Sequence, residues 1–149
     1  MEPPALLDLN VLIALFDPDH VHHEPAHDWF AQSRHRGWAT SPLTENGLVR
    51  VLSNPRYGAT VQRAGDILTR LASFCESGHH HFWAGTVSLR EETLFARRFI
   101  SGHRQLTDIY LLAIALKHGG RLATFDRTIP HKAVIGARRD TLEVIGPAG

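Results

Sequence analysis

Four carboxylates in this chain stand at the end of a predicted strand or in the first turn of a predicted helix: Asp8, Glu45, Asp108 and Asp126. In open parallel α/β sheets, ligands bind beyond the carboxyl ends of the strands, where the following helices begin. If the predicted strands pair in parallel, the four acidic side chains converge at one edge of the sheet. The spacing therefore predicts a single acidic site built from distant parts of the chain.

Clustered carboxylates repel one another, and a divalent cation removes that penalty. Asp8 interrupts an otherwise apolar stretch, where a buried unpaired carboxylate costs several kcal/mol, and a cation is the partner we expect. Oxygen ligands suit Mg²⁺ or Mn²⁺ better than Zn²⁺. Such a metal can activate a water molecule for attack on a phosphodiester, which needs no nucleophilic side chain.

Each carboxylate also has a simpler structural explanation. Glu45 and Asp108 could be ordinary first-turn residues of helices, where a negative charge is favourable. Asp126 could start a turn, because Asp side chains commonly bond the backbone two residues further on. These alternatives stay open for each residue taken alone.

A competing motif is His23-Glu24-Pro25-Ala26-His27, which matches the H-E-x-x-H pattern of zinc metalloproteases. The pattern requires both histidines on one face of a helix. We expect the helix to begin at Pro25, which would leave His23 outside it and separate the two imidazoles. The protease hypothesis is therefore disfavoured. The run His79 to His81 cannot chelate one ion from a strand, because consecutive side chains point to opposite faces.

Short apolar strands alternate with helices, which predicts an α/β fold with a mostly parallel sheet. The expected strands are 5–7, 37–40, 80–83, 121–125 and 142–145. The expected helices are a first helix from about residue 8 to 16, then 25–33, 42–53, 60–76, 89–100 and 106–118, with Ser41 and Thr107 as caps of two of them. Residues 146–149 are expected to be a flexible tail.

The length of 149 residues fits one domain, and we expect a single domain over residues 1–149. The formal net charge is +1, so nucleic-acid binding would need a local basic patch rather than a global positive field. Arg104 and Arg127 are the best candidates, because they neighbour Asp108 and Asp126. The single cysteine, Cys75, suits a reducing compartment and is expected to be a small buried residue on a helix. Without a secretory signal or a membrane-spanning run, the protein is expected to be cytoplasmic and soluble.

Four segments resemble, in order, the motifs of PIN-domain toxins from bacterial VapBC-type toxin–antitoxin pairs. They are residues 6–12 (LLDLNVL), 41–45 (SPLTE), 106–113 (LTDIYLLA) and 119–127 (GGRLATFDR). The resemblance spans nearly the whole chain and implies a PIN-like three-layer α/β/α sandwich. It also implies a Mg²⁺-dependent endoribonuclease, with Mn²⁺ as a possible substitute.

Carried over by motif, the resemblance makes the four carboxylates the metal-binding and catalytic residues. Asn10 would orient Asp8 or a bound water, and Thr124 would support the site through its hydroxyl. A homodimer and a cognate antitoxin are implied as well. The alternative is a catalytically silent PIN-like module that binds RNA or a protein. Which RNA is cut stays open.

Overall fold

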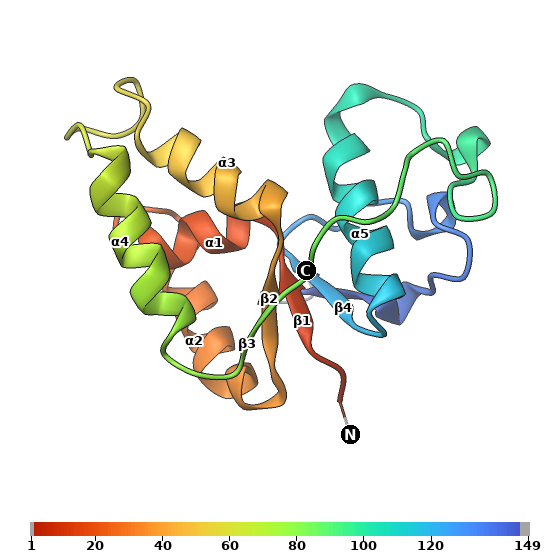
Figure 1. The fold of residues 1–149 in the computed structure, drawn as a ribbon, viewed down its shortest axis with the longest axis horizontal. Coiled ribbons are helices and arrows are strands. Elements are labelled where there is room, and N and C mark those ends of the chain that lie inside the picture. The colour runs from red at the N-terminus through yellow and green to blue at the C-terminus, as the bar shows by residue number, and fades with distance from the viewer. Residues whose placement is uncertain (1, 147–149) are drawn as a thin grey trace.

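The computed structural model describes residues 2–146, which form a five-stranded sheet between two helical layers (Figure 1). The strands are β1 (Ala5–Leu7), β2 (Trp38–Thr40), β3 (His80–Phe82), β4 (Arg121–Thr124) and β5 (Leu142–Val144). Their order is β3-β2-β1-β4-β5, and every neighbouring pair is parallel. The predicted α/β/α sandwich is therefore confirmed, with a sheet that is entirely parallel rather than mostly so.

The helices divide unequally between the two faces of the sheet. In Figure 1, α1 (Leu9–Phe16), α2 (His23–Ser33), α3 (Pro42–Leu52) and α4 (Ala64–Cys75) lie on one side of the strands, and α5 (Leu106–Lys117) lies on the other. Short 3-10 turns connect the remaining segments at Arg34–Arg36, Arg97–Phe99, His103–Gln105, His131–Ala133 and Arg139–Thr141. The sheet is thus covered on both faces, as parallel sheets require.

The central strand β1 explains the apolar start of the chain. Its three residues are all buried, with Leu7 in the core under α1–α4 and Leu6 in the core under α5. A strand buried on both faces needs apolar residues at every position rather than at alternate ones.

Helix α3 begins as the sequence predicts. Ser41 is the N-cap, Pro42 occupies the first turn, and Thr44 completes a capping box with Ser41. The cap predicted for α5 is wrong. Gln105, not Thr107, occupies the N-cap position, and its side chain makes no capping hydrogen bond.

The predicted helix over residues 60–76 is shorter at its start and less buried than expected. Helix α4 begins at Ala64, and only Ile67 and Leu71 are buried along it. Val61 and Leu68 are 63% and 53% exposed. The stripe predicted from the sequence contains more apolar residues than the structure buries. The reason is that α4 packs mainly against α3 at the outside of its layer.

The helix predicted over residues 89–100 is wrong. The segment forms turns and a short 3-10 helix, and Phe95 makes an antiparallel bridge with Val134. The amide of Ala96 donates to the carbonyl of Ala133, and the amide of Ile135 donates to Leu94. These long-range backbone bonds, together with burial of Phe95 to 2% exposure, replace those of a helix.

The remaining boundaries agree with the sequence to within a residue or two, as expected for helix and strand ends. The predicted tail falls mostly on residues 147–149, which lie outside the described residues. Within residues 2–146, no helix combines the length and the apolar character needed to cross a membrane.

Candidate active site

Three of the four predicted carboxylates meet at the carboxyl edge of the sheet. Asp8 follows β1, Asp126 follows β4, and Asp108 lies in the first turn of α5. Strands β1 and β4 are neighbours, and the amide of Asp8 donates to the carbonyl of Ala123 at 3.0 Å. The strand order therefore places two acidic ends side by side, and α5 brings the third over them.

Asp8 is the most buried carboxylate, with 2% of its surface exposed. It is the N-cap of α1, where its Oδ1 accepts a hydrogen bond from the amide of Val11 at 3.0 Å. Burial raises the pKa of Asp8, and the charge of Asp126 adds to that effect, while hydrogen bonds from Thr124, Val11 and Asn10 oppose it. Capping therefore explains why a carboxylate is tolerated here, but it does not remove the cost of its charge.

Thr124 connects the two strand ends. Its hydroxyl interacts with Asp8 and accepts the backbone N–H of Asp126 at 3.0 Å. The side chain is completely buried. A single threonine hydroxyl thus sets the position of both acidic residues relative to β4.

Asp126 forms a turn with Thr128 as well as facing Asp8. Its Oδ1 accepts the amide of Thr128 at 2.7 Å and the hydroxyl of Thr128 at 2.6 Å. Gln105, at the start of α5, donates its side-chain amide to the carbonyl of Thr128 at 2.7 Å. Sequence reasoning did not identify Gln105 or Thr128, although the Asp-x-Thr spacing is typical of such a turn. The pair ties the start of α5 to the end of β4.

Asp108 shows the repulsion that the sequence predicts for clustered carboxylates. Burial, followed by the charges of Asp8 and Asp126, raises its pKa to about 7. In the absence of a cation, a large fraction of Asp108 therefore carries a proton at neutral pH. The simpler explanation is a solvated first-turn helix residue. Such a residue would not have a pKa raised by burial and by neighbouring negative charges.

The donors at this edge fit a hard divalent cation. All three side chains offer carboxylate oxygens, which Mg²⁺ and Mn²⁺ prefer. The three carboxylates do not all approach within 4.8 Å of one another. Mg²⁺ retains several of its waters and binds through one or two carboxylates, so this spacing suits it better than a closed protein cage.

Glu45 is placed differently from the other three carboxylates. It lies in the first turn of α3, and its Oε2 accepts the hydroxyl of Thr40 at 2.7 Å. The same hydroxyl lies 2.7 Å from Nε2 of His80 on β3. The carboxylate charges that act on Asp108 come from Asp8 and Asp126. The side chain of Glu45 thus lies toward Thr40 and β3.

The supporting residues predicted from the motifs have mixed surroundings. Asn10 contributes its backbone N–H to Asp8, while its side chain is exposed. Arg104 is exposed in the 3-10 turn before α5 and lines a polar pocket of about 410 Å³ with Asp126. Arg127 is exposed directly after Asp126.

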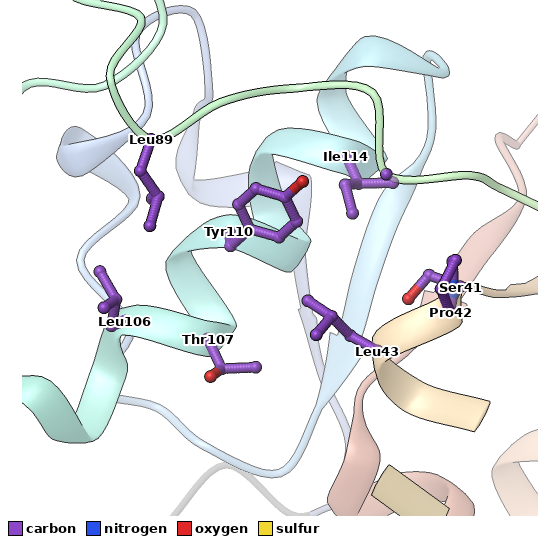
Figure 2. Close-up of a pocket in the computed structure, with 9 residues that line it drawn as sticks. Ser41, Pro42, Leu43, Leu89, Leu106, Thr107, Tyr110 and Ile114 are labelled. Carbon is purple, nitrogen blue, oxygen red and sulfur yellow. The ribbon is translucent and has the colours of Figure 1, made fainter. Parts of the chain in front are cut away.

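An apolar pocket of about 400 Å³ lies at the same edge, between the start of α3 and α5. Figure 2 shows Leu43 of α3 facing Tyr110 and Leu106 of α5, with Leu89 on the far wall. Thr107, which precedes Asp108, lies on its floor in this view. The carboxyl edge therefore offers apolar surface next to the acidic residues.

The H-E-x-x-H prediction needs a correction. Helix α2 begins at His23, not Pro25, so His23 and His27 share one face with ring centroids 4.4 Å apart. Pro25 is tolerated as the third helical residue, because the first N–H groups of a helix have no partner within it. Nδ1 of His23 lies 2.7 Å from the carbonyl of Ala14, and Nε2 of His27 lies 2.9 Å from that of Leu15.

These two histidines therefore attach α2 to the end of α1. Among residues 2–146, no third His, Cys, Asp or Glu joins them in a group with metal-ligand spacing. The zinc protease hypothesis stays disfavoured, although the reason derived from the sequence was wrong.

Comparison with known proteins identifies the family of the chain. A family model for the PIN domain matches residues 5–135. The chain is 44% identical to Ribonuclease VapC44 of Mycobacterium tuberculosis over 143 residues, which cover 95% of this chain and 99% of that protein. It is 42% identical to Ribonuclease VapC39 of the same organism over 132 residues (89% and 95%), and 41% identical to Ribonuclease VapC29 over 127 residues (85% and 89%). The chain therefore belongs to the PIN domain family, as a member of the VapC type.

Proposed function

We propose that this VapC-type toxin is a metal-dependent endoribonuclease whose centre is formed by Asp8, Asp108 and Asp126, with Mg²⁺ as the cofactor and Mn²⁺ as a possible substitute. The observation that carries the proposal is the placement of these three carboxylates at the carboxyl edge of a parallel sheet, where burial and their like charges raise the pKa values of Asp8 and Asp108. A site that stabilises ionised carboxylates poorly on its own gains most from a cation.

The chain's own residues hold the site in place before any ligand binds. Asp8 is fixed by Val11 and Thr124, and Asp126 is fixed by Thr128. Asp108 is expected to release its proton when positive charge arrives, because burial and the charges of Asp8 and Asp126, which raise its pKa, both disfavour the ionised form only while no cation is near. A bound divalent cation supplies the chemistry of such a centre, polarising the phosphate and lowering the pKa of a bound water. The expected RNA products carry 5′-phosphate and 3′-hydroxyl ends.

RNA contacts are proposed near the carboxylates. Arg104 lines the polar pocket beside Asp126, where a guanidinium can hold a backbone phosphate. Arg127, the neighbour of Asp126 in the sequence, is proposed to do the same. The apolar pocket of Figure 2 offers Tyr110 and leucine side chains to unstacked bases. With a net charge of +1, specificity is expected from these local contacts rather than from a global field.

The partners proposed for the chain are an antitoxin and a second copy of itself. Both follow from its membership of the VapC type, whose toxins act in VapBC pairs. An antitoxin that places an Arg beside Asp8 would compete with RNA for the same negative charges. Light scattering of the purified chain, alone and with its cognate antitoxin, measures both associations.

The test is cleavage of total RNA by purified, antitoxin-free protein, with Mg²⁺, with Mn²⁺ and with a chelator. Asp8→Asn is the diagnostic variant, because asparagine still caps α1 but lacks the charge. Asp66→Asn is the matched control, since Asp66 is an exposed first-turn carboxylate of α4.

Discrete metal-dependent fragments that disappear only in Asp8→Asn would support the proposal, and sequencing their ends would identify the cleavage site. Equal cleavage by Asp8→Asn would show that the acidic centre is misassigned. A folded protein that binds RNA and cuts none of it in either metal would instead favour a silent PIN-like binding module.

A further inference from the structure

Glu45, Cys75 and His80 form a second group of potential ligands beside the acidic centre. They come from α3, the end of α4 and the start of β3, which are distant in sequence. One ligand atom from each residue lies within 4.8 Å of the other two. Among residues 2–146, this is the only set of three or more such side chains with this spacing.

The three side chains gather around one buried hydroxyl. Oγ1 of Thr40 is 2.7 Å from Oε2 of Glu45 and 2.7 Å from Nε2 of His80. It also forms a side-chain hydrogen bond with the thiol of Cys75. A hydroxyl has a single proton and donates to one partner only, here the carboxylate of Glu45. His80 and Cys75 must then direct their own protons toward Thr40.

The donor chemistry differs from that of the acidic centre. A thiolate, an imidazole and a carboxylate form a mixed set that suits Zn²⁺ and is poorly suited to Mg²⁺. Bonds to Zn²⁺ of about 2.0–2.3 Å place tetrahedral ligand atoms roughly 3.5 Å apart. Movements of about 1 Å in the side chains therefore suffice to bring the three ligand atoms to this spacing. All three residues are partly exposed, which leaves a path for the ion and room for a water as the fourth ligand.

We propose that Glu45, Cys75 and His80 bind one Zn²⁺ ion, separate from the acidic centre. The ion replaces the thiol proton of Cys75, which passes to solvent, and His80 binds as a neutral imidazole whose single ring proton moves to its other nitrogen. Water completes the tetrahedron. Binding would join α3, α4 and β3 at the outer end of the sheet. It would also hold Glu45 in its present direction. The proposal does not depend on nuclease activity.

Cobalt titration tests the site, since Co²⁺ reports a thiolate ligand through a sulfur-to-metal charge-transfer band. Cys75 is the only cysteine in the chain, so any such band belongs to it. Chelator-treated protein is expected to develop the band at one equivalent of Co²⁺ and to lose it on addition of one equivalent of Zn²⁺. Cys75→Ser should abolish the band, and His80→Asn or Glu45→Gln should weaken Co²⁺ binding at least about tenfold.

His81→Asn is the matched control, because His81 is the exposed neighbour of His80 and points to the opposite face of β3. It and Asp8→Asn should leave the band unchanged. Circular dichroism of each variant checks that it folds. Absence of the band, or a band that persists unchanged in His80→Asn and Glu45→Gln, would overturn the proposal. In that case the three side chains form a hydrogen-bonded network around Thr40 and nothing more.

Discussion

Charged side chains are arranged differently at the two ends of the parallel strands. They form ion pairs at the amino end and have like charges at the carboxyl end. At the amino end, Arg36 forms ion pairs with Glu143 at 2.5 Å and with Glu2 at 3.1 Å, and Arg121 lies 3.8 Å from Glu143. The indole of Trp29 donates to the same glutamate at 2.6 Å. Positive and negative groups alternate there, and each carboxylate has a partner.

At the carboxyl end, Asp8, Asp108 and Asp126 repel one another, and burial together with this repulsion raises the pKa of Asp108 to about 7. The difference distinguishes charges that stabilise the fold from charges that are available to bind a ligand. Paired charges stabilise the fold without a ligand, whereas like charges held together in a rigid site lower stability and are retained for what they bind. The comparison predicts that variants at the two ends will have opposite effects on activity and stability.

The largest expected effect is on cleavage at the carboxyl end. Asp108→Asn should lower RNA cleavage by more than about 100-fold. Loss of an outer-shell partner at a metal site costs up to about that much, and Asp108 is proposed to contact the metal directly. Because the variant removes repulsion, it should melt at the same or a higher temperature than the wild-type chain without metal. Cleavage assays and thermal melts in chelator measure the two. A variant that loses activity and also melts much lower would show that Asp108 is structural.

The amino end should give the reverse result. Glu143→Gln leaves the guanidinium of Arg36, 6% exposed, without its closest carboxylate. We expect a loss of about 2 kcal/mol in unfolding free energy, below the about 3–5 kcal/mol for fully buried pairs because glutamine keeps one acceptor. Cleavage should be unchanged when the protein is folded.

Glu92→Gln is the matched control for that measurement. Its ion pair with Arg97 is 75% and 66% exposed, so urea unfolding should shift by little. Equal losses from Glu143→Gln and Glu92→Gln would mean that the buried network at the amino end contributes nothing special.

The sequence predicts the residues of the carboxyl end with unequal success. Asp8 was predictable because it is a carboxylate that interrupts the apolar run joining β1 to α1. The central strand was predictable because it is apolar at every position, as a strand must be when Leu6 and Leu7 face two different cores. The direction of Glu45 was not predictable, because it depends on Thr40 and on His80, which is 35 residues away along the chain from Glu45.

Two errors have the same physical origin. The segment 89–100 has helical periodicity, but its backbone pairs with residues 133–135, and a local pattern contains no information about that partner. The start of α2 at His23 depends on contacts of His23 and His27 with the end of α1. In both places a tertiary contact decided between local structures of similar energy.

A finer comparison uses two buried threonines that make the same backbone contact at opposite ends. Thr124 accepts the amide of Asp126, and Thr141 accepts the amide of Arg138, each at 3.0 Å. Thr141→Val should cost about 1 kcal/mol of stability for one lost hydrogen bond, and Thr124→Val about 2 kcal/mol because its hydroxyl also bonds Asp8. Only Thr124→Val should also reduce cleavage, by about 10–100-fold, because it releases Asp8 and Asp126. Equal activity of the two variants would remove Thr124 from the site.

The last expected effect is on the pH dependence of stability without metal. The pKa of Asp108 rises from 3.8 to about 7 in the folded chain, so between these values the folded state holds a proton that the unfolded state has lost. The contribution of Asp108 to stability is therefore complete below about pH 4 and is lost as the pH rises through about 7. Histidines titrate in the same range, so the measurement is the difference in melting temperature between Asp108→Asn and wild type. That difference should increase in favour of the variant from pH 5 to pH 8 in chelator, and Mg²⁺ at pH 8 should reverse it by stabilising only the ionised wild-type site. A difference that stays constant with pH would mean that Asp108 is ionised throughout, and the like-charge character of the carboxyl end would then lose its main support.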